Sequence, residues 1–341
     1  MAEYPPEFHP LGLTALRGAG GFSGAQVWRV TTAAGICALR ATPRSGIVPE
    51  RLTGLHRLLV HVQRLGISQS PMPIRTMRGG TWIEQASCVW QLEPWMPGAP
   101  EATESPSKTR IAAALALLAR WHQAAVRYVP SAADAGWFAS CAAGTPAGLC
   151  ERLAVIARWD RARCELIRAR LRRREWPEFD EPGERLLALY QREAPAIARD
   201  LEIARGTTVP LQPCLRDVWK AHVLFEGDAV TGLIDPHACR TESLAADVAR
   251  LLGSLVGDDR KGWDVGLTAY QQLRPLNLDE LGLVELYDRS TVLLSGLTWL
   301  EWQHVEKRRF DQPLRVVARL QSILARLERL VEGTTWEQRS F

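Results

Sequence analysis

The chain has 341 residues, of which 46% are hydrophobic, which is enough for a buried core in two domains or two unequal lobes. A mainly disordered chain is therefore excluded. The 42 lysines and arginines exceed the 38 acidic residues by only +4, and no basic block indicates a nucleic-acid partner. Scattered cysteines without metal-binding spacing, an N-terminus without an apolar leader and no apolar run of about 18 residues predict a cytoplasmic protein without a membrane partner.

The N-terminal part of the chain combines strand and turn signals with one helix. Four short apolar runs bounded by turn residues predict strands. These runs are residues 25–30, 36–40, 81–84 and 88–92. Residues 49–65 predict an amphipathic helix, because four apolar residues recur at helical spacing before Gly66. They are Leu52, Leu55, Leu59 and Val62. Two prolines and a glycine within residues 93–98 predict a connector.

After the connector, the pattern is mainly helical. Residues 109–126 predict one helix, and several arginine-rich amphipathic segments fill residues 151–205. Residues 312–331 predict a last helix that packs through one apolar face. This face comprises Leu314, Val317, Leu320, Leu324, Leu327 and Val331. Strand signals followed by long helices indicate an α+β protein.

Residues 213–235 interrupt the helical pattern and bring polar side chains together. The apolar runs 223–225 and 230–234 flank a Glu-Gly-Asp turn, which predicts an antiparallel hairpin. His222 opens the first strand and Asp235 closes the second, so their Cβ atoms are expected about 5 Å apart, a gap that a metal ion can bridge. Asp217, on the loop that enters the hairpin, can project a second carboxylate toward the same place. Two carboxylates and an imidazole are therefore expected to converge.

This combination suits phosphoryl transfer. One carboxylate can orient and deprotonate an attacking hydroxyl, and another can hold the cation that bridges nucleotide phosphates. Backbone N–H groups of a glycine-rich turn can approach phosphate oxygens closely, and Arg40 on the following strand can neutralise them. The glycines of this turn are Gly18, Gly20, Gly21 and Gly24.

The order of these motifs resembles the aminoglycoside phosphotransferase and choline kinase family, small-molecule relatives of the protein kinases. In that family the loop reads His-Gly-Asp-x-x-x-x-Asn, and here it reads Leu-Arg-Asp-x-x-x-x-His over residues 215–222. The Leu-Ile-Asp sequence at 233–235 resembles the family's metal-binding strand end. The resemblance implies a protein-kinase-like two-lobed fold. A small β-rich nucleotide-binding lobe is expected at residues 1–95, and a larger helical lobe with the catalytic hairpin at residues 96–341.

The resemblance also implies roles for individual residues. Asp217 would be the catalytic base, and Asp235, with His222 beside it, would bind the metal. Arg40 and the glycine-rich turn would hold the phosphates of ATP, while Glu93 and Trp95 would lie at the adenine. The implied cofactors are ATP and a divalent cation, Mg²⁺ or Mn²⁺. The acceptor would be a hydroxyl group of a small molecule.

Three residues depart from the family pattern. Leu215 replaces a histidine that braces the loop, and Arg40 replaces a lysine, so a planar guanidinium stands where the family has a compact ammonium. His222 replaces an asparagine, and an imidazole nitrogen is a poorer ligand for Mg²⁺ than an amide oxygen but a good one for Mn²⁺. The sequence therefore predicts an altered metal preference or a reduced turnover.

Several alternatives stay open. The chain can be a pseudokinase, a nucleotide- or partner-binding module with weak or no catalysis. Asp235 can form an Asx turn before Pro236, and His222 can be a structural histidine. His237 is expected to point to solvent. The family pairs its strand cation with an acid of the following helix, but the only acid there, Glu50, lies opposite the apolar face. The partner of Arg40, the acceptor and the oligomeric state are therefore open.

Overall fold

The computed structural model describes residues 1–16, 25–103, 105–310 and 312–332. The chain forms two compact units. The first consists of Met1–Cys141, Gln212–Thr241 and Asp264–Pro275, and the second of Ala142–Leu211, Glu242–Trp263 and Leu276–Phe341. An N-terminal antiparallel sheet precedes a largely helical region, which confirms the α+β class.

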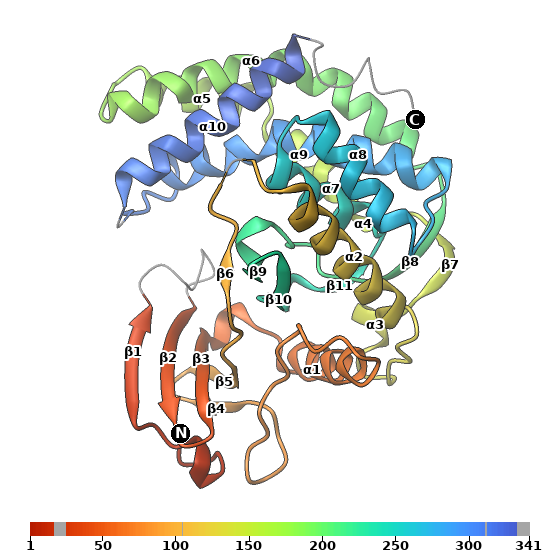
Figure 1. The fold of residues 1–341 in the computed structure, drawn as a ribbon. Coiled ribbons are helices and arrows are strands. Elements are labelled where there is room, and N and C mark those ends of the chain that lie inside the picture. Colours follow the sequence, from red (N-terminus) through yellow and green to blue (C-terminus); the bar gives the residue numbers. More distant parts are fainter. Residues whose placement is uncertain (17–24, 104, 311, 333–341) are drawn as a thin grey trace. The chain divides into compact units, whose positions relative to one another are not determined.

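The N-terminal sheet has the order β1-β2-β3-β5-β4, and all neighbouring strands are antiparallel (Figure 1). The strands are β1 (Gly12–Leu16), β2 (Gln26–Thr32), β3 (Gly35–Pro43), β4 (Ile83–Gln85) and β5 (Cys88–Pro94). The four predicted strands are confirmed, and β1 is an additional edge strand. Val30, Leu39 and Leu92 contribute to a buried cluster with Tyr4, so this sheet has its own small core.

The predicted first helix is confirmed as α1 (Pro49–Arg64). Its four predicted apolar residues are all buried, because 3.6-residue periodicity places them on one face. Glu50 lies in the first turn and is exposed, as its position opposite that face predicts. Short 3₁₀ helices lie at η1 (Pro6–Phe8), η2 (Arg44–Gly46), η3 (Lys220–His222) and η4 (Pro236–Ala238).

The predicted hairpin is confirmed as β9 (Val223–Glu226) and β10 (Ala229–Leu233). A third strand, β6 (Ala99–Pro100), pairs with β9 immediately after the connector. Gly98 precedes β6 with φ +91°, and a Cβ there would meet Thr231 Oγ1 at 2.4 Å and the Phe225 carbonyl oxygen at 2.7 Å. The approach of the connector to the hairpin therefore requires glycine at this position.

The first unit also contains α2 (Lys108–Ala125) and α3 (Ala135–Phe138). Ser107 caps α2 by accepting a hydrogen bond from the backbone N–H of Arg110 at 3.1 Å. The predicted helix at 109–126 is thereby confirmed within one residue at either end. The elements in which the chain passes between the units are β7 (Cys141–Gly144), β8 (Val209–Cys214), β11 (Arg240–Glu242) and α8 (Arg260–Gln271).

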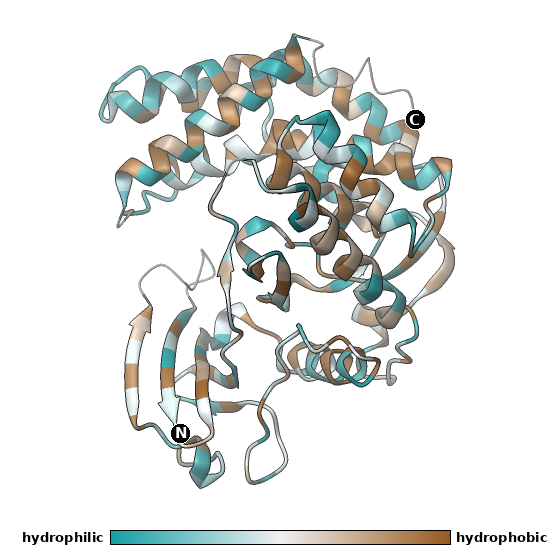
Figure 2. Cartoon of the chain, in the orientation of Figure 1, coloured by the Kyte–Doolittle hydropathy of each residue, from teal (hydrophilic) through white to brown (hydrophobic). Residues whose placement is uncertain are grey.

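The second unit is helical. Its helices are α4 (Ala147–Arg158), α5 (Arg161–Leu171), α6 (Pro177–Ala204), α7 (Ala245–Val256), α9 (Leu278–His304) and α10 (Pro313–Val331). The last predicted helix is confirmed as α10, along which apolar and hydrophilic residues alternate (Figure 2). Leu320 and Leu327 are buried, but Leu314 is 86% exposed. The prediction that Leu314 packs was wrong, since this residue lies in the first turn of α10, where the first buried residue is Val316.

No helix among the described residues is both long and apolar enough to span a membrane.

Candidate functional site

The candidate site lies in the first unit, where the two ends of the β9–β10 hairpin meet. A bulge between Val230 and Gly232 shifts the register, so that the backbone N–H of Ile234 donates to the His222 carbonyl at 2.9 Å. His222 Nε2 then lies 3.8 Å from Asp235 Oδ2. The two side chains therefore face one another, as the hairpin predicts.

Asp235 adopts an unusual backbone conformation, and its carboxylate contacts the side chains of Arg40 and His237. Its φ of 58° and ψ of 57° place it in the left-handed region, which aspartate tolerates better than most residues. Oδ1 lies 3.1 Å from Arg40 Nη2 and 3.0 Å from His237 Nδ1. Its side chain makes no capping hydrogen bond to η4, so the Asx-turn alternative is wrong.

The environment keeps Asp235 ionised. Burial alone would raise the pKa of this carboxyl, but the hydrogen bond from His237 and the charge of Arg40 hold that pKa well below its usual range. A carboxylate that stays ionised and keeps Oδ2 on the side of His222 is chemically suited to bind a divalent cation.

His237 does not point to solvent, and that expectation was wrong. Its Nδ1 donates to Asp235 Oδ1 at 3.0 Å, and its Nε2 lies 3.0 Å from the side-chain nitrogen of Gln91 on β5. Burial lowers the pKa of His237 despite the hydrogen bond with Asp235. A neutral imidazole therefore fixes the orientation of the carboxylate without adding a charge.

Both ring nitrogens of His222 have partners. Nδ1 lies 2.7 Å from the Asp217 carbonyl oxygen, which can only accept, so Nδ1 carries the proton. Nε2 accepts the indole N–H of Trp219 at 3.0 Å. The lone pair with which His222 could bind a metal ion is therefore occupied by Trp219, and metal binding requires this hydrogen bond to open.

Asp217 is joined to the hairpin through its backbone. Its carbonyl oxygen accepts from His222, and its side chain is half-buried. The preceding Arg216 has φ 64°, so a left-handed residue stands directly before Asp217. Leu215, at the position of the family's loop histidine, is buried.

Arg40 on β3 has Asp235 as its acidic partner, so the strand cation is not paired with an acid of α1. The helix instead presents Arg51, whose Nη2 donates to the carbonyl oxygens of His237 at 2.7 Å and Cys239 at 2.8 Å. The link between α1 and the segment after Asp235 is thus made by a cation and backbone carbonyls. The sequence could not have revealed this contact through an acid on this helix, because Arg51 binds backbone carbonyls.

The two expected adenine residues lie in different surroundings. Glu93 is in β5, opposite Ala38 of β3, and burial raises the pKa of its carboxyl to about 7, with Arg40 opposing and Asp235 reinforcing this shift. Glu93 therefore belongs electrostatically to the Arg40–Asp235 group. The backbone N–H of Trp95 donates to the Ile36 carbonyl at 3.0 Å, and the Arg29 guanidinium carbon lies 5.6 Å from the centre of its ring.

The glycine-rich turn lies outside the described residues. It contains Gly18, Gly20, Gly21 and Gly24. The described site therefore consists of Arg40, Glu93, His222, Asp235 and the loop at Asp217. Sequence reasoning missed His237, Gln91 and Arg51. The Pro-His pair directly after Asp235 was the only available signal for the first of these.

The sequence profile of the phosphotransferase enzyme family matches residues 14–284. No curated protein sequence matches this chain. Among solved structures, a microcompartment-associated aminopropanol kinase is 15% identical, with 98% of this chain and 96% of that chain covered and a TM-score of 0.67. A spectinomycin phosphotransferase, solved with ADP and spectinomycin, is 11% identical, with coverage of 96% and 94% and a TM-score of 0.65. An amicoumacin kinase, solved with AMP-PNP and Ca²⁺, is 14% identical, with coverage of 96% and 95% and a TM-score of 0.64.

Proposed function

We propose that this chain, which belongs to the phosphotransferase enzyme family, transfers the γ-phosphoryl group of ATP to a hydroxyl group of a small molecule. The observation that carries this proposal is the Arg40–Asp235–His222 arrangement at the end of the hairpin. It combines an ionised carboxylate for a cation with a guanidinium for phosphate oxygens, as phosphoryl transfer requires. The solved relatives bound to ADP or AMP-PNP support ATP as the donor.

In this proposal Asp217 acts as the general base. Its carboxylate accepts the proton of the acceptor hydroxyl, whose oxygen forms a bond to the γ-phosphorus while the bond to the bridging oxygen of ADP breaks. The transfer is direct, without a phosphorylated residue. His222 holds the Asp217 backbone in place through its Nδ1–H, which makes it a positioning residue in the described arrangement.

The residues present fit a divalent cation at Asp235. Its Oδ2 is not used by Arg40 or His237, which both contact Oδ1. Asp235 would hold the cation, and His222 would join only after Trp219 releases Nε2. A bound Mg²⁺ or Mn²⁺ would neutralise charge on the phosphates. Arg40 supports phosphate binding as well, because its buried Nε has no acceptor among the described residues and buried donors are normally paired.

Backbone chemistry of the connector favours Met96 over Trp95 as the donor to adenine. The Trp95 N–H is already bonded to Ile36, and the prolines at 94 and 97 have no N–H. Among residues 94–97, Met96 is therefore the one whose backbone N–H can serve as the donor to adenine. Glu93 would act through its contact with the charges of Arg40 and Asp235 rather than through adenine.

A pseudokinase is the second candidate function. It is favoured by one observation, the hydrogen bond from Trp219 to His222 Nε2, which occupies a possible metal ligand. In that case the chain would bind nucleotide without measurable transfer.

The test measures phosphate transfer from ATP to a panel of amino alcohols, aminosugars and sugars, with Mg²⁺ or Mn²⁺. Asp217→Asn is expected to lower turnover at least about 100-fold while ATP affinity changes little. Asp228→Asn, in the exposed turn of the same hairpin, is the matched control and should retain activity. ATP binding by the wild type with no transfer to any acceptor would favour the pseudokinase, and full activity of Asp217→Asn would reject Asp217 as the base.

A further inference from the structure

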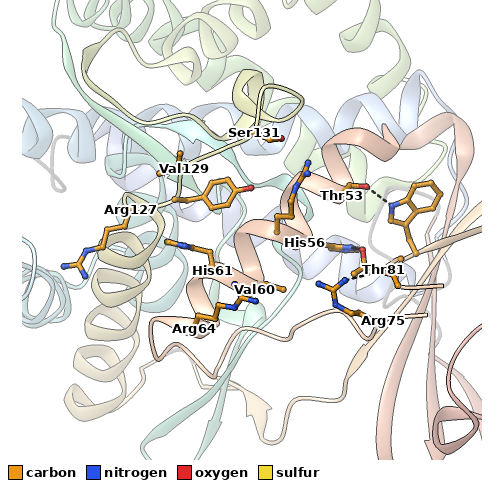
Figure 3. Close-up of a pocket in the computed structure, with 15 residues that line it drawn as sticks. Thr53, His56, Val60, His61, Arg64, Arg75, Thr81, Arg127, Val129 and Ser131 are labelled. Carbon is orange, nitrogen blue, oxygen red and sulfur yellow. Dashed lines mark hydrogen bonds between the residues drawn. The ribbon is translucent and has the colours of Figure 1, made fainter. Parts of the chain in front are cut away.

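A cavity lies in the first unit, on the side of α1 that carries Thr53, Arg57 and Arg64. Its volume is about 810 Å³, within the range of small-molecule sites. Its lining residues come from α1, from the segment 75–82 before β4, and from the segment 127–131 after α2 (Figure 3). The phosphotransfer residues described above do not line it.

The charge of this cavity is one-sided. Four arginines line it, and the lining residues include no aspartate or glutamate. These are Arg57, Arg64, Arg75 and Arg127. A concave surface whose charged side chains are all positive concentrates anions.

The arginines of the cavity are poorly neutralised. Arg64 has no ion-pair partner among the residues that the structure describes. Within the same described residues, Arg75 donates to the Gly79 carbonyl, at 2.9 Å, and has no acidic partner. Arg57 Nε lies 3.4 Å from Asp134 Oδ2, but Tyr128 Oη and Ser131 Oγ also donate to that carboxylate, at 2.7 and 2.5 Å. Elsewhere on the chain, exposed arginines such as Arg172 do contact acids. The cavity therefore contains guanidinium groups whose charge is not fully neutralised by acids among the described residues.

The interior of the cavity is uncharged and partly aromatic. Trp82 donates its indole N–H to Thr53 Oγ1 at 2.9 Å, and His56 Nδ1 lies 2.7 Å from Thr81 Oγ1, as the dashed lines in Figure 3 mark. Burial and the neighbouring His237 lower the pKa of His56 to about 3, so this imidazole stays neutral. Val60 adds apolar surface. A ligand with both negative groups and an organic body would complement this lining.

We propose that this cavity is a second binding site, distinct from the phosphotransfer site, for a small organic polyanion that carries phosphate or carboxylate groups. Guanidinium groups of Arg57, Arg64 and Arg75 bind the negative groups, and Trp82 and Val60 contact the body of the ligand. Guanidinium groups bind the negatively charged oxygens of phosphate esters and of polycarboxylates alike, so ligands of both classes are tested.

Inorganic pyrophosphate and citrate are titrated into the full-length protein by calorimetry, without nucleotide or divalent cation. At least one probe should bind, and Arg64→Ala and Arg75→Ala should each weaken binding at least about tenfold. Arg78→Ala is the matched control, since Arg78 belongs to the same segment, is 85% exposed and does not line the cavity. It should change affinity by less than about twofold.

The preferred probe distinguishes the two ligand classes. Tighter binding of pyrophosphate assigns phosphate, and tighter binding of citrate assigns carboxylate. The proposal is overturned if neither pyrophosphate nor citrate binds. Binding that Arg64→Ala and Arg75→Ala leave unchanged, including binding at the phosphotransfer site, overturns it as well. Circular dichroism of each variant excludes a folding defect, and the outcome does not depend on whether the chain transfers phosphate.

Discussion

Arg40 Nη2 on β3 lies 3.1 Å from Oδ1 of Asp235, which follows the β9–β10 hairpin. This ion pair gives the strand cation the acidic partner that the sequence of α1 does not supply. It also joins two segments almost two hundred positions apart into one electrostatic group with Glu93. The charge balance of the site is therefore set by two carboxyls around one guanidinium.

Two substitutions of Arg40 should show whether ATP binding depends on its positive charge or on the planar shape of its guanidinium group. Arg40→Ala removes the partner of Asp235 and the cation proposed to bind phosphate, so KM for ATP should rise at least about tenfold. Arg40→Lys keeps the charge and should stay within about threefold of the wild type. Initial-rate kinetics with varied ATP measure both. An unchanged KM for Arg40→Ala would remove Arg40 from the phosphate site. Arg44→Ala, an exposed arginine after the same strand, serves as the control.

Glu93 should make stability depend on pH. Its carboxyl pKa is raised from 4.5 to about 7, so between these values the folded state holds a proton that the unfolded state releases. Stability therefore falls as pH rises through this window. Glu93→Gln has no buried carboxyl to ionise. Its free energy of unfolding should exceed that of the wild type at pH 8.5 by on the order of 2 kcal/mol, with little difference near pH 4.5.

Urea unfolding from pH 4.5 to 8.5 measures the effect of Glu93→Gln. Glu84→Gln, on the exposed part of β4, controls for the loss of any carboxylate from this sheet. A constant difference between Glu93→Gln and the wild type across the pH range would contradict a raised pKa at Glu93.

The metal preference should depend on Trp219. Trp219→Phe removes the indole N–H that occupies His222 Nε2, so the imidazole becomes available to Mn²⁺. The concentration of Mn²⁺ at half-maximal activity should fall severalfold, while that of Mg²⁺ changes little. His222→Asn should shift the preference toward Mg²⁺ in either background. Equal use of both metals by the wild type and Trp219→Phe would rule out His222 as a ligand.

Arg51 should couple α1 to the site. Arg51→Ala leaves two carbonyl oxygens without their charged donor, and two such hydrogen bonds together contribute about 2 to 4 kcal/mol. The free energy of unfolding should fall by that order, and turnover should fall because the segment after Asp235 loses its anchor. Arg51→Lys should restore part of both. An active, fully stable Arg51→Ala variant would show that α1 is held by other contacts.

Much of the fold follows from local pattern. The helix α1 and the hairpin β9–β10 have strong periodicity and turn residues, and both were predicted within a few residues. The edge strand β1 was missed, because its residues are mostly exposed and carry no clear alternation. Helix α6 contains Pro182 and Pro195 and runs for 28 residues, although proline normally interrupts a helix.

The site was only partly predictable, because its contacts depend on register and backbone conformation. The meeting of His222 and Asp235 followed from the hairpin, yet the bulge that sets their approach did not. The left-handed conformation of Asp235 turns the chain so that His237 reaches back to it, and no spacing rule predicts this. The Trp219–His222 hydrogen bond joins residues whose types alone suggest packing and metal binding.

The contact at Gly98 restricts how relatives of this chain can diverge. A methyl group at position 98 and the hydroxyl of Thr231 compete for the same space, and the Phe225 carbonyl leaves no room for either to move aside. A smaller residue at 231 would remove only one of these contacts, because the Phe225 backbone and the φ of +91° at position 98 would remain. In an alignment, position 98 should therefore stay glycine whatever residue stands at 231, so this steric exclusion would leave a detectable evolutionary signature.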